Sequence, residues 1–267
     1  MKRRTVVKKL SLLSLASIAQ GGVTGFSDLT GMSQGDPGLA FEELRELAPG
    51  VFFIKGRLGY FKSGNFQEVE CNNGWIIFDN FVVLIDSNFP AKAKILLKEI
   101  RKTTSKPIRY VVNTHHHGDH LYANRFWFNQ GAAIVSHRGV AEELRKFETG
   151  HYSGKPGRWE DASRRRDDLI EFPLLPPSLT FEEQLVIEDK NRRLELIHLA
   201  PGHTRGDAVA WLPNEKIIFT GDSCLNGPFN LFMDAHILSW IEALDKMQNL
   251  KPELSFPGME IPVTLKV

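Results

Sequence analysis

The sequence is poor in cysteine, because its 267 residues include only Cys71 and Cys224. Two cysteines so far apart do not establish a disulfide, and we favour two unpaired thiols over a Cys71–Cys224 bond. No glycine-rich phosphate loop follows a strand pattern, and no Gly-x-Ser-x-Gly nucleophile elbow occurs. The chain therefore lacks the signatures of P-loop nucleotide binding and of serine hydrolases built on that elbow.

An excess of charge of either sign is also missing. The sequence has 33 lysines and arginines against 32 aspartates and glutamates, a formal net charge of +1, and it has no basic stripe. Nucleic acid is therefore a poor candidate partner. The length allows one large domain or two small ones. The oligomeric state has no signature in the sequence.

Long hydrophobic runs are missing except near the N-terminus. Residues 1–9 are basic and residues 10–19 are apolar, a pattern typical of a cleaved signal peptide over residues 1–19. The run is shorter than the ~20 residues that span a bilayer, so no membrane contact is expected after cleavage. Arg3-Arg4 resembles a twin-arginine signal, and an ordinary Sec signal is the alternative. Either signal predicts a periplasmic or secreted protein.

Cleavage of that signal would change the charge and leave a polar leader. Residues 1–19 carry five positive charges and no negative ones, so the mature chain would have a formal net charge of −4. Residues 20–44 are expected to form a flexible leader, since their first part is rich in Gly, Ser, Asp and Thr. Residues 45–267 are expected to form the folded domain.

Strand and helix patterns alternate through that domain. Short apolar runs predict strands at 51–54, 75–78, 81–85, 108–112, 132–135, 185–187, 194–197, 208–212, 217–219 and 254–256. Helical spacing predicts helices from Pro90 to about Arg101 and over 121–128, 139–147 and 237–250. Asn72-Asn73-Gly74 is interpreted as a turn, and residues 149–166 as a loop. Helices alternating with strands and hairpins predict an α/β (α+β) fold of helix-covered sheets rather than a plain parallel sheet.

One stretch, Thr114-His115-His116-His117-Gly118-Asp119-His120, concentrates metal-ligating side chains at the end of a predicted strand. Because strand side chains alternate in direction, His115 and His117 can face one point together. Asp119 and His120 follow the turn and can face a second point nearby. Imidazole and carboxylate together suit zinc, and imidazole also suits iron. The stretch therefore predicts one metal site or two adjacent sites.

Two further strand ends carry ligand-type residues. His203 follows the turn Pro201-Gly202, and Asp222 follows the predicted strand 217–219. A carboxylate has two oxygens, so Asp222 can bridge two cations. Three strand ends thus deliver six candidate metal ligands: His115, His117, Asp119, His120, His203 and Asp222.

Residues 45–258 resemble the metallo-beta-lactamase superfamily. The resemblance rests on His115-x-His117-x-Asp119-His120, on Pro201-Gly202-His203-Thr204-x-Gly206-Asp207 and on Gly221-Asp222, with Asp86 as a further match. It implies a single-domain, four-layer αββα sandwich that binds one or two zinc ions. It also implies that His115, His117 and His203 bind the first metal and that Asp119 and His120 bind the second. Asp222 would bridge the metals or bind the second, and Asp119 would also act in catalysis by orienting the nucleophile.

The chain departs from the family pattern at Met259. The family usually has Pro-Gly-His there, and that histidine completes the second metal site, whereas this sequence has Pro257-Gly258-Met259-Glu260. A thioether is a soft ligand and suits zinc poorly beside carboxylates. The second site is therefore expected to be weakened, completed by Glu260 or His236, or lost, unless the C-terminal sequence itself has been altered or truncated.

The resemblance implies a zinc-dependent hydrolase that acts on a small-molecule substrate, in which metal-bound hydroxide attacks the carbonyl of a beta-lactam, thioester, lactone or other ester. Together with the signal pattern of residues 1–19, it predicts an exported enzyme. One alternative is a mononuclear iron persulfide dioxygenase that uses His115, His203 and Asp222. The other is a metal-binding member with reduced or no catalysis, because Met259 replaces the final histidine.

Several residues near the motifs receive weaker interpretations. His116 and His198 are expected to support ligands or the fold, and His137, His151 and His236 to be structural or exposed. Cys224 lies two residues after Asp222 and is either close to the metals or packed in the core. The last two candidates, which could contact substrate or serve only as turn residues, are Asn226 and Asn230.

Overall fold

The first of two sheets follows the order of the chain. The computed structural model describes residues 42–56, 70–148, 168–225, 232–259 and 263–264. The seven strands lie in the order β1 (Glu42–Ala48), β2 (Val51–Lys55), β3 (Asn73–Ile77), β4 (Val82–Ile85), β5 (Ile108–Asn113), β6 (Ala133–His137) and β7 (Leu179–Phe181). Strands β1 to β4 pair antiparallel, and β4 to β7 pair parallel.

Parallel neighbours need crossover connections, and helices provide them. Helix α2 (Pro90–Thr103) joins β4 to β5, and the short helices α3 (Gly118–Leu121) and α4 (Asn124–Asn129) join β5 to β6. Helices α5 (Arg138–Glu148) and α7 (Asp168–Glu171) lie between β6 and β7. The chain leaves β4 and β5 at the same edge of the sheet, so Asp86 and His115 follow adjacent strand ends.

The second sheet is mainly antiparallel. Its six strands lie in the order β13 (Val263–Thr264), β12 (Leu254–Pro257), β11 (Ile217–Gly221), β10 (Val209–Leu212), β9 (Arg193–Ile197) and β8 (Gln184–Glu188). Only β11 and β12 pair parallel, and helix α8 (Ile237–Asn249) makes the crossover between them.

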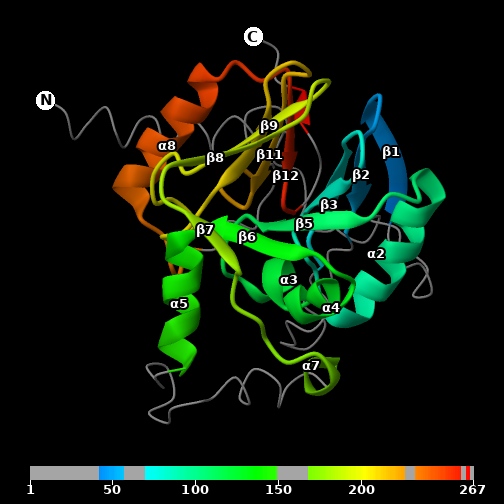
Figure 1. The fold of residues 1–267 in the computed structure, drawn as a ribbon. Coiled ribbons are helices and arrows are strands. Elements are labelled where there is room, and N and C mark those ends of the chain that lie inside the picture. Colours follow the sequence, from blue (N-terminus) through cyan, green and yellow to red (C-terminus); the bar gives the residue numbers. More distant parts are fainter. Residues whose placement is uncertain (1–41, 57–69, 149–167, 226–231, 260–262, 265–267) are drawn as a thin grey trace, which may run out of the picture. The chain divides into compact units, whose positions relative to one another are not determined.

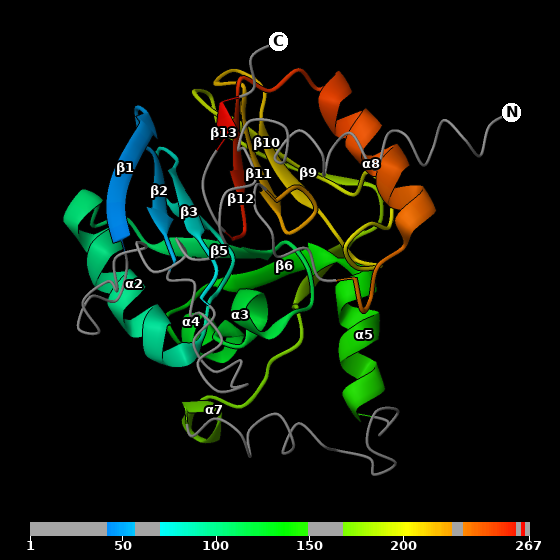
Figure 2. The same cartoon turned by 180° about the vertical axis from the view of Figure 1, so that it is seen from behind.

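Alternating side chains build four layers. In β10, Ala210 and Leu212 face a core between the two sheets, whereas Val209 and Trp211 face outward and pack with Met247 of α8. The first sheet follows the same rule, because its outward side chains pack with α2 and α4 in a second apolar cluster. Figure 1 shows α8 beside the β8–β11 sheet and α2 to α4 below β5 and β6, and Figure 2 shows the same order from behind. The predicted αββα sandwich is confirmed.

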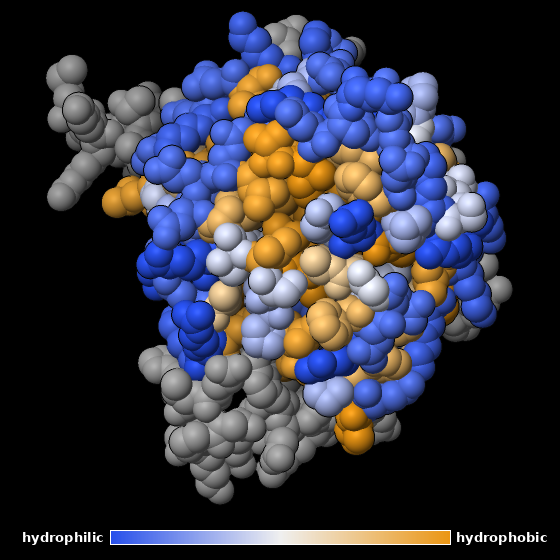
Figure 3. Space-filling view, in the orientation of Figure 1, coloured by the Kyte–Doolittle hydropathy of each residue, from blue (hydrophilic) through white to orange (hydrophobic). Residues whose placement is uncertain are grey.

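The edge of this sandwich exposes part of the core between the sheets. Figure 3 shows apolar side chains gathered between β8–β9 and β5–β6, with hydrophilic side chains around them. Partly buried residues that pack against the inter-sheet core include Phe81, Tyr110 and Leu185. Among the described residues, no helix has the length and apolar character needed to cross a bilayer.

The predicted helix over 121–128 is wrong in detail, because two short helices replace it. Tyr122 N still donates to Gly118 O, but Ala123 N donates to Asn88 O at 2.8 Å. That long-range bond takes the place of the next helical bond, so α3 ends and α4 starts in a new direction. The distant carbonyl therefore decides where the helix stops.

The predicted turn at Asn72-Asn73-Gly74 is also wrong, because Asn73 and Gly74 begin strand β3. A Cβ on Gly74 would lie 2.2 Å from the Phe219 ring of the other sheet, so glycine serves close packing here. The Asn73 amide donates to Ile85 O and to Asp86 O at 3.1 and 2.8 Å. Strand β1 also begins at Glu42, within the stretch expected as leader.

Candidate metal centre

Asp86 ties together three segments that carry ligand-type residues. Its backbone has a φ of 61°, an uncommon value for a residue with a side chain. The carboxylate accepts hydrogen bonds from Thr114 N at 2.8 Å and from His120 Nδ1 at 2.8 Å. Thr114 precedes His115, and His120 lies in α3. The hydrogen bonds of Asp86 to Thr114 and His120 therefore stabilise its unusual backbone conformation at the end of β4.

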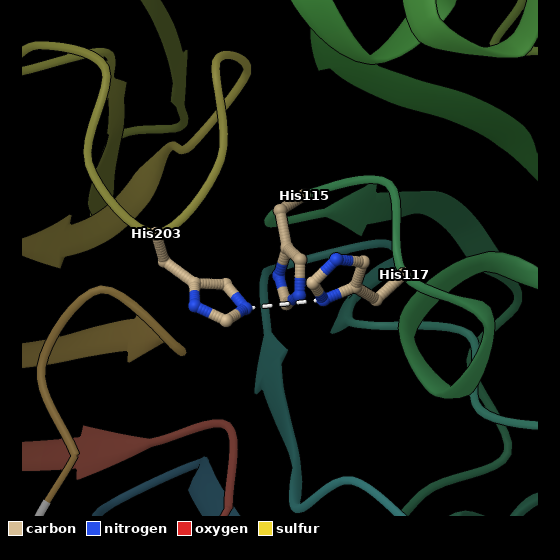
Figure 4. A group of neighbouring side chains, drawn as sticks. All are labelled: His115, His117 and His203. Atoms are coloured by element: carbon tan, nitrogen blue, oxygen red, sulfur yellow. Dashed lines mark hydrogen bonds between the residues drawn. The ribbon is translucent and has the colours of Figure 1, made fainter. Parts of the chain in front are cut away.

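Three imidazole rings converge at one point, as Figure 4 shows. His115 follows β5, His117 caps the N-terminus of α3, and His203 lies in the turn between β9 and β10. His203 Nε2 lies 3.0 Å from His117 Nδ1, and the three ring centroids are 4.8 to 5.0 Å apart. Each residue offers one ring nitrogen within 4.8 Å of the others. We call these residues the imidazole cluster.

The neighbours of His117 determine which of its nitrogens carries the proton. His117 Nε2 lies 2.9 Å from Asp234 Oδ2. Hydrogen bonds from His116 and His117 hold the pKa of Asp234 well below its usual value, so this carboxylate accepts and His117 Nε2 donates. In the neutral ring, Nδ1 then has a free lone pair directed at the imidazole cluster. This is the tautomer that a metal ligand needs.

The remaining candidate ligands form a second, acidic group that we call the carboxylate cluster: Asp119, His120 and Asp222. His120 Nε2 lies 3.3 Å from Asp119 Oδ2 and 3.5 Å from Asp222 Oδ1. The other oxygen of Asp222 lies 3.7 Å from His203 Nε2. Asp222 thus stands between the two clusters with one oxygen toward each, the arrangement that a bridging carboxylate requires.

The carboxylate cluster has strongly perturbed proton affinities. Burial opposes the charged form of His120, but Asp119, Asp86 and Asp222 together raise its pKa well above the usual value. Burial and the charge of Asp119 raise the pKa of Asp222 to about 7, although His120 opposes that rise. Burial alone would raise the pKa of Asp119, yet His120 lowers it. The positive charge of one imidazolium is too small to compensate the negative charge of several buried carboxylates, so an added cation would stabilise their ionised form.

The imidazole cluster is perturbed in the opposite direction. Burial lowers the pKa of His115 well below its usual value, and the neighbouring histidines lower it further. His115 Nε2 is buried and has no hydrogen bond among the described residues. Zinc binds histidine nitrogens at 2.0–2.1 Å, which separates tetrahedral ligands by about 3.3 Å. The 3.0 Å between His117 Nδ1 and His203 Nε2 is close to that value, so the residues present fit a zinc ion.

The departure at Met259 lies beside the carboxylate cluster. A Cβ on Gly258 would lie 2.5 Å from Asp222 Oδ1 and 2.7 Å from His120 Cε1. Gly258 N donates to Gly221 O, and Met259 is buried. The segment that carries the family histidine therefore passes this cluster, with a thioether at that position. Glu260 lies outside the described residues, and His236 caps α8 with its N–H donated to Gly202 O.

Both cysteines are free thiols, as favoured from the sequence. Cys224 packs with the apolar residues under α8, including Trp211 and Met247, which supports the core interpretation. Cys71 is buried, and its thiol donates to Asp119 O at 2.9 Å. Its sulfur also lies within 4.8 Å of ligand atoms of Asp86 and His120. This place for Cys71 was not predictable, because the only local pattern beside it is the turn-like Asn72-Asn73-Gly74.

The other histidines have distinct surroundings. His116 Nε2 lies 3.7 Å from Asp234 Oδ2, so His116 supports the residue that holds His117. His198 Nδ1 lies 2.7 Å from Asp207 O, and its ring stacks on His137 at 3.8 Å between centroids. His151, Asn226 and Asn230 lie outside the described residues.

Asp234 is a further residue of the candidate centre that the sequence did not reveal. It lies between β11 and α8, in a stretch without strand or helix periodicity and 117 positions from His117. A carboxylate near a histidine cluster leaves no sequence pattern when the two are joined only by the tertiary fold.

Comparisons with known proteins place these clusters in a family. The model of the metallo-beta-lactamase superfamily matches residues 67–259. A 2,4-dinitroanisole O-demethylase subunit alpha from Nocardioides sp. is 24 % identical over 83 % of this chain. A hydroxyacylglutathione hydrolase from Pelagibacter ubique is 25 % identical over 59 % of this chain. The chain spans 60 % and 54 % of the length of these two relatives.

A solved structure agrees on the fold. The metallo-beta-lactamase from Pontibacter korlensis superposes with a TM-score of 0.65 and 21 % identity, covering 83 % of this chain and 93 % of that one. At this identity the likeness is one of fold alone. The matched family model covers both predicted ligand clusters, from His115 to Asp222. The chain belongs to the metallo-beta-lactamase superfamily.

Proposed function

We propose that the chain is an exported zinc-dependent hydrolase that cleaves a carbonyl substrate. The observation that carries the proposal is the imidazole cluster, where His203 Nε2 lies 3.0 Å from His117 Nδ1 and Asp234 holds His117 in the ligand tautomer. His115 Nε2 completes the group as a buried nitrogen with no hydrogen bond among the described residues. Three imidazole nitrogens that converge beside carboxylates are a donor set typical of zinc hydrolases.

In the proposed hydrolysis, a zinc ion and the side chains of the chain have separate roles. A zinc ion, when bound, acidifies water and polarises a carbonyl. Hydrolysis then joins a water oxygen to the carbonyl carbon, breaks the bond to the leaving group and moves one proton to that group. We assign Asp119 to orient the water and accept its proton. Asp119 Oδ2 and Asp222 Oδ1 lie 3.3 and 3.5 Å from His120 Nε2, so His120 faces both carboxylates.

The names of similar proteins support hydrolysis without selecting a substrate. One relative is named a hydroxyacylglutathione hydrolase, and the superposed structure is named a metallo-beta-lactamase. Beta-lactams, thioesters, lactones and other esters therefore stay the candidate substrates. Export to the periplasm or the medium is proposed from the signal pattern of residues 1–19.

A mononuclear iron site is the second candidate. Two histidines and one carboxylate form the facial triad of iron oxygenases, and His203 lies 3.7 Å from Asp222. His115 and Asp222 also belong to one group of converging ligand atoms. The held tautomer of His117 favours zinc instead, because a triad of His115, His203 and Asp222 does not use that nitrogen.

Metal content per chain, measured by elemental mass spectrometry on purified protein, tests the proposal together with a hydrolase screen. One or two zinc ions with turnover of a lactam, thioester, lactone or ester are expected. One iron per chain with persulfide oxidation would replace the proposal with the dioxygenase. Stoichiometric metal with no turnover of any of these substrates would identify a metal-binding member without catalysis.

A further inference from the structure

Segment 232–238 concentrates exposed apolar side chains. Among the described residues, eight large hydrophobic side chains are exposed, and half of them lie in this segment: Phe232, Met233, Ile237 and Leu238. Phe232 is 58 % exposed and Met233 is 80 % exposed. Single exposed apolar residues are ordinary, whereas a group of them marks a binding surface. We call these four residues the apolar rim.

The apolar rim adjoins the imidazole cluster. Asp234, which lies within segment 232–238, holds His117 Nε2 at 2.9 Å. The Phe232 ring lies 5.9 Å from the Trp240 ring, and Trp240 lies 5.8 Å from the ring of His203. The backbone of His236 is bonded to Gly202 O at 2.8 Å, next to His203. The rim is thus attached to two of the three residues in the imidazole cluster.

Solvent reaches the centre on the same side. The His117 side chain is 22 % exposed, whereas those of His203 and His120 are 1 % and 0 % exposed. His117 is also the ligand that Asp234 contacts from the rim segment. A substrate that approaches the centre beside His117 therefore meets the apolar rim.

The rim carries little charge. Asp234 is the only Asp, Glu, Lys or Arg in residues 232–241, and its carboxylate is already bonded to His117. An anionic substituent at the rim would find no lysine or arginine within this segment, while an alkyl or aryl group would cover apolar area. We propose that the apolar rim binds an uncharged alkyl or aryl substituent of the substrate. This inference rests on the proposed hydrolytic function and names the substrate class.

The first test is an acyl-chain series of p-nitrophenyl esters on the zinc-loaded full chain. We expect kcat/KM to rise about 16- to 250-fold from acetate to hexanoate, because each of the four added methylenes, when buried, contributes about a two- to fourfold gain. In Phe232→Ser and Met233→Ser the rise should shrink to about threefold or less, on the same per-methylene scale. A chain-length dependence that both variants keep in full would overturn the inference.

Phe128→Ser is the matched control. Phe128 is 46 % exposed, comparable to Phe232, and lies in α4 before β6. The first residue of β6, Ala133, pairs with Tyr110 near the start of β5, whereas His115 follows the other end of β5. The control variant should keep the wild-type chain-length dependence. Because Met233 is 80 % exposed, Met233→Ser empties no buried position, and it therefore separates a lost subsite from a disturbed core.

A binding measurement without turnover separates this inference from the proposed function. Alkyl hydroxamates chelate zinc and are not cleaved, so calorimetry reports their affinity directly. We expect affinity to rise with chain length in the wild type and much less in Met233→Ser. If no ester is turned over but this dependence holds, the hydrolase proposal fails and the subsite stands. If esters are cleaved and neither series depends on chain length, the subsite fails and the hydrolase stands.

A membrane surface is the competing occupant of an exposed apolar rim. Binding of wild-type protein to phosphatidylcholine vesicles, lost in Met233→Ser and without any acyl-chain dependence of the esters, would replace the substrate subsite with a lipid-docking surface. No binding to vesicles is expected.

Discussion

The imidazole cluster and the carboxylate cluster differ in how they are held. His117 of the first cluster is oriented by Asp234, whose side chain is 44 % exposed and lies outside the sheets. His120 of the second is oriented by Asp86, whose side chain is 2 % exposed and is bonded to Thr114 as well. Changes that weaken the first cluster should therefore leave the fold intact, whereas Asp86 belongs to both the centre and the core.

The two clusters also differ in charge. Burial and neighbouring imidazoles lower the pKa of His115, so this residue of the first cluster offers a neutral nitrogen without a bound cation. In the second cluster, burial and Asp119 raise the pKa of Asp222 to about 7, so its carboxylates repel one another when ionised. A bound cation would thus accept lone pairs from the nitrogens of the first cluster and would neutralise the carboxylates of the second. The predictions below change one cluster or the other, and the last compares them with a histidine pair outside both.

Removing an imidazole from the first cluster should have the largest effect. We expect His115→Ala or His203→Ala to lower kcat/KM by at least about 10³-fold, since a zinc site that loses one of three nitrogens binds metal poorly. Metal content should fall in parallel, measured by elemental mass spectrometry. His137→Gln, a histidine outside both clusters, should keep metal and activity. Full activity in either alanine variant would refute the assignment.

Removing the support of His117 should have a smaller effect. Asp234→Asn keeps the shape but weakens the bond that holds His117 in its ligand tautomer, and we expect about 10- to 100-fold weaker metal affinity. A competition titration against a chromophoric chelator measures it. Glu253→Gln is the control, because it removes only an exposed ion pair with Lys216 and should change little. Equal affinities in Asp234→Asn and wild type would show that Asp234 is only structural.

Restoring an imidazole beside the second cluster should strengthen it. Gly258 packs against Asp222 and His120, so residue 259 follows directly at this cluster. We expect Met259→His to raise the affinity for the second zinc by about tenfold or more, because imidazole suits zinc better than a thioether beside carboxylates. Calorimetric titration with zinc counts the sites. Met259→Leu, which adds no ligand, should bind as the wild type does, and unchanged stoichiometry in Met259→His would contradict the prediction.

The ligand residues were predictable because strand ends carry them in short patterns. The spacing from His115 to His120, the turn before His203 and the acid after β11 pointed to six residues that the structure brings into two adjacent clusters. Strands that alternate with helices predicted helix-covered sheets, and the family resemblance implied their arrangement in four αββα layers. Their roles as metal ligands stay a prediction that the variants above test.

What the sequence did not predict depends on contacts between distant segments. Gly74 looked like a turn residue, but a ring of the other sheet requires its small size. Asp234 had no pattern because its partner lies 117 positions away. The break between α3 and α4 depends on a bond from Ala123 to Asn88. In each case the local sequence is compatible with the wrong interpretation, and only tertiary packing decides.

Removing the charge of Asp222 should stabilise the metal-free protein and destabilise the zinc-bound protein. In metal-free protein at pH 8, above the pKa of about 7, the Asp222 carboxylate is ionised beside Asp119. Because the pKa of Asp222 is raised in the folded chain, ionising this acid costs more in the folded than in the unfolded state, and that cost is complete above about pH 7. We therefore expect Asp222→Asn to increase the unfolding free energy of metal-free protein by about 1–2 kcal/mol and to raise its melting temperature. With saturating zinc the order should reverse. A lower melting temperature of the metal-free variant would contradict the proposed repulsion.

The smallest expected effect concerns the stacked pair of His137 and His198, which lies outside both clusters. It shows how burial changes the pH dependence of stability. Burial first, and then His198, lower the pKa of His137 from 6.5 to about 4. Between pH 6.5 and 4 the unfolded chain therefore binds a proton that the folded ring refuses, so stability falls as pH falls through this window. The ring is half-buried, and after discounting for solvent screening we expect a loss of about 1 kcal/mol.

Thermal melts of metal-free wild type and His137→Gln across this pH range test the effect. The variant should lose less stability between pH 6.5 and 4, because it lacks the group that titrates. His236→Gln is the control, since His236 is exposed and does not stack on His198, and it should follow the wild-type curve. If His137→Gln also follows that curve, His137 is not held neutral by its surroundings. The contrast with the imidazole cluster would then depend on a bound metal rather than on burial.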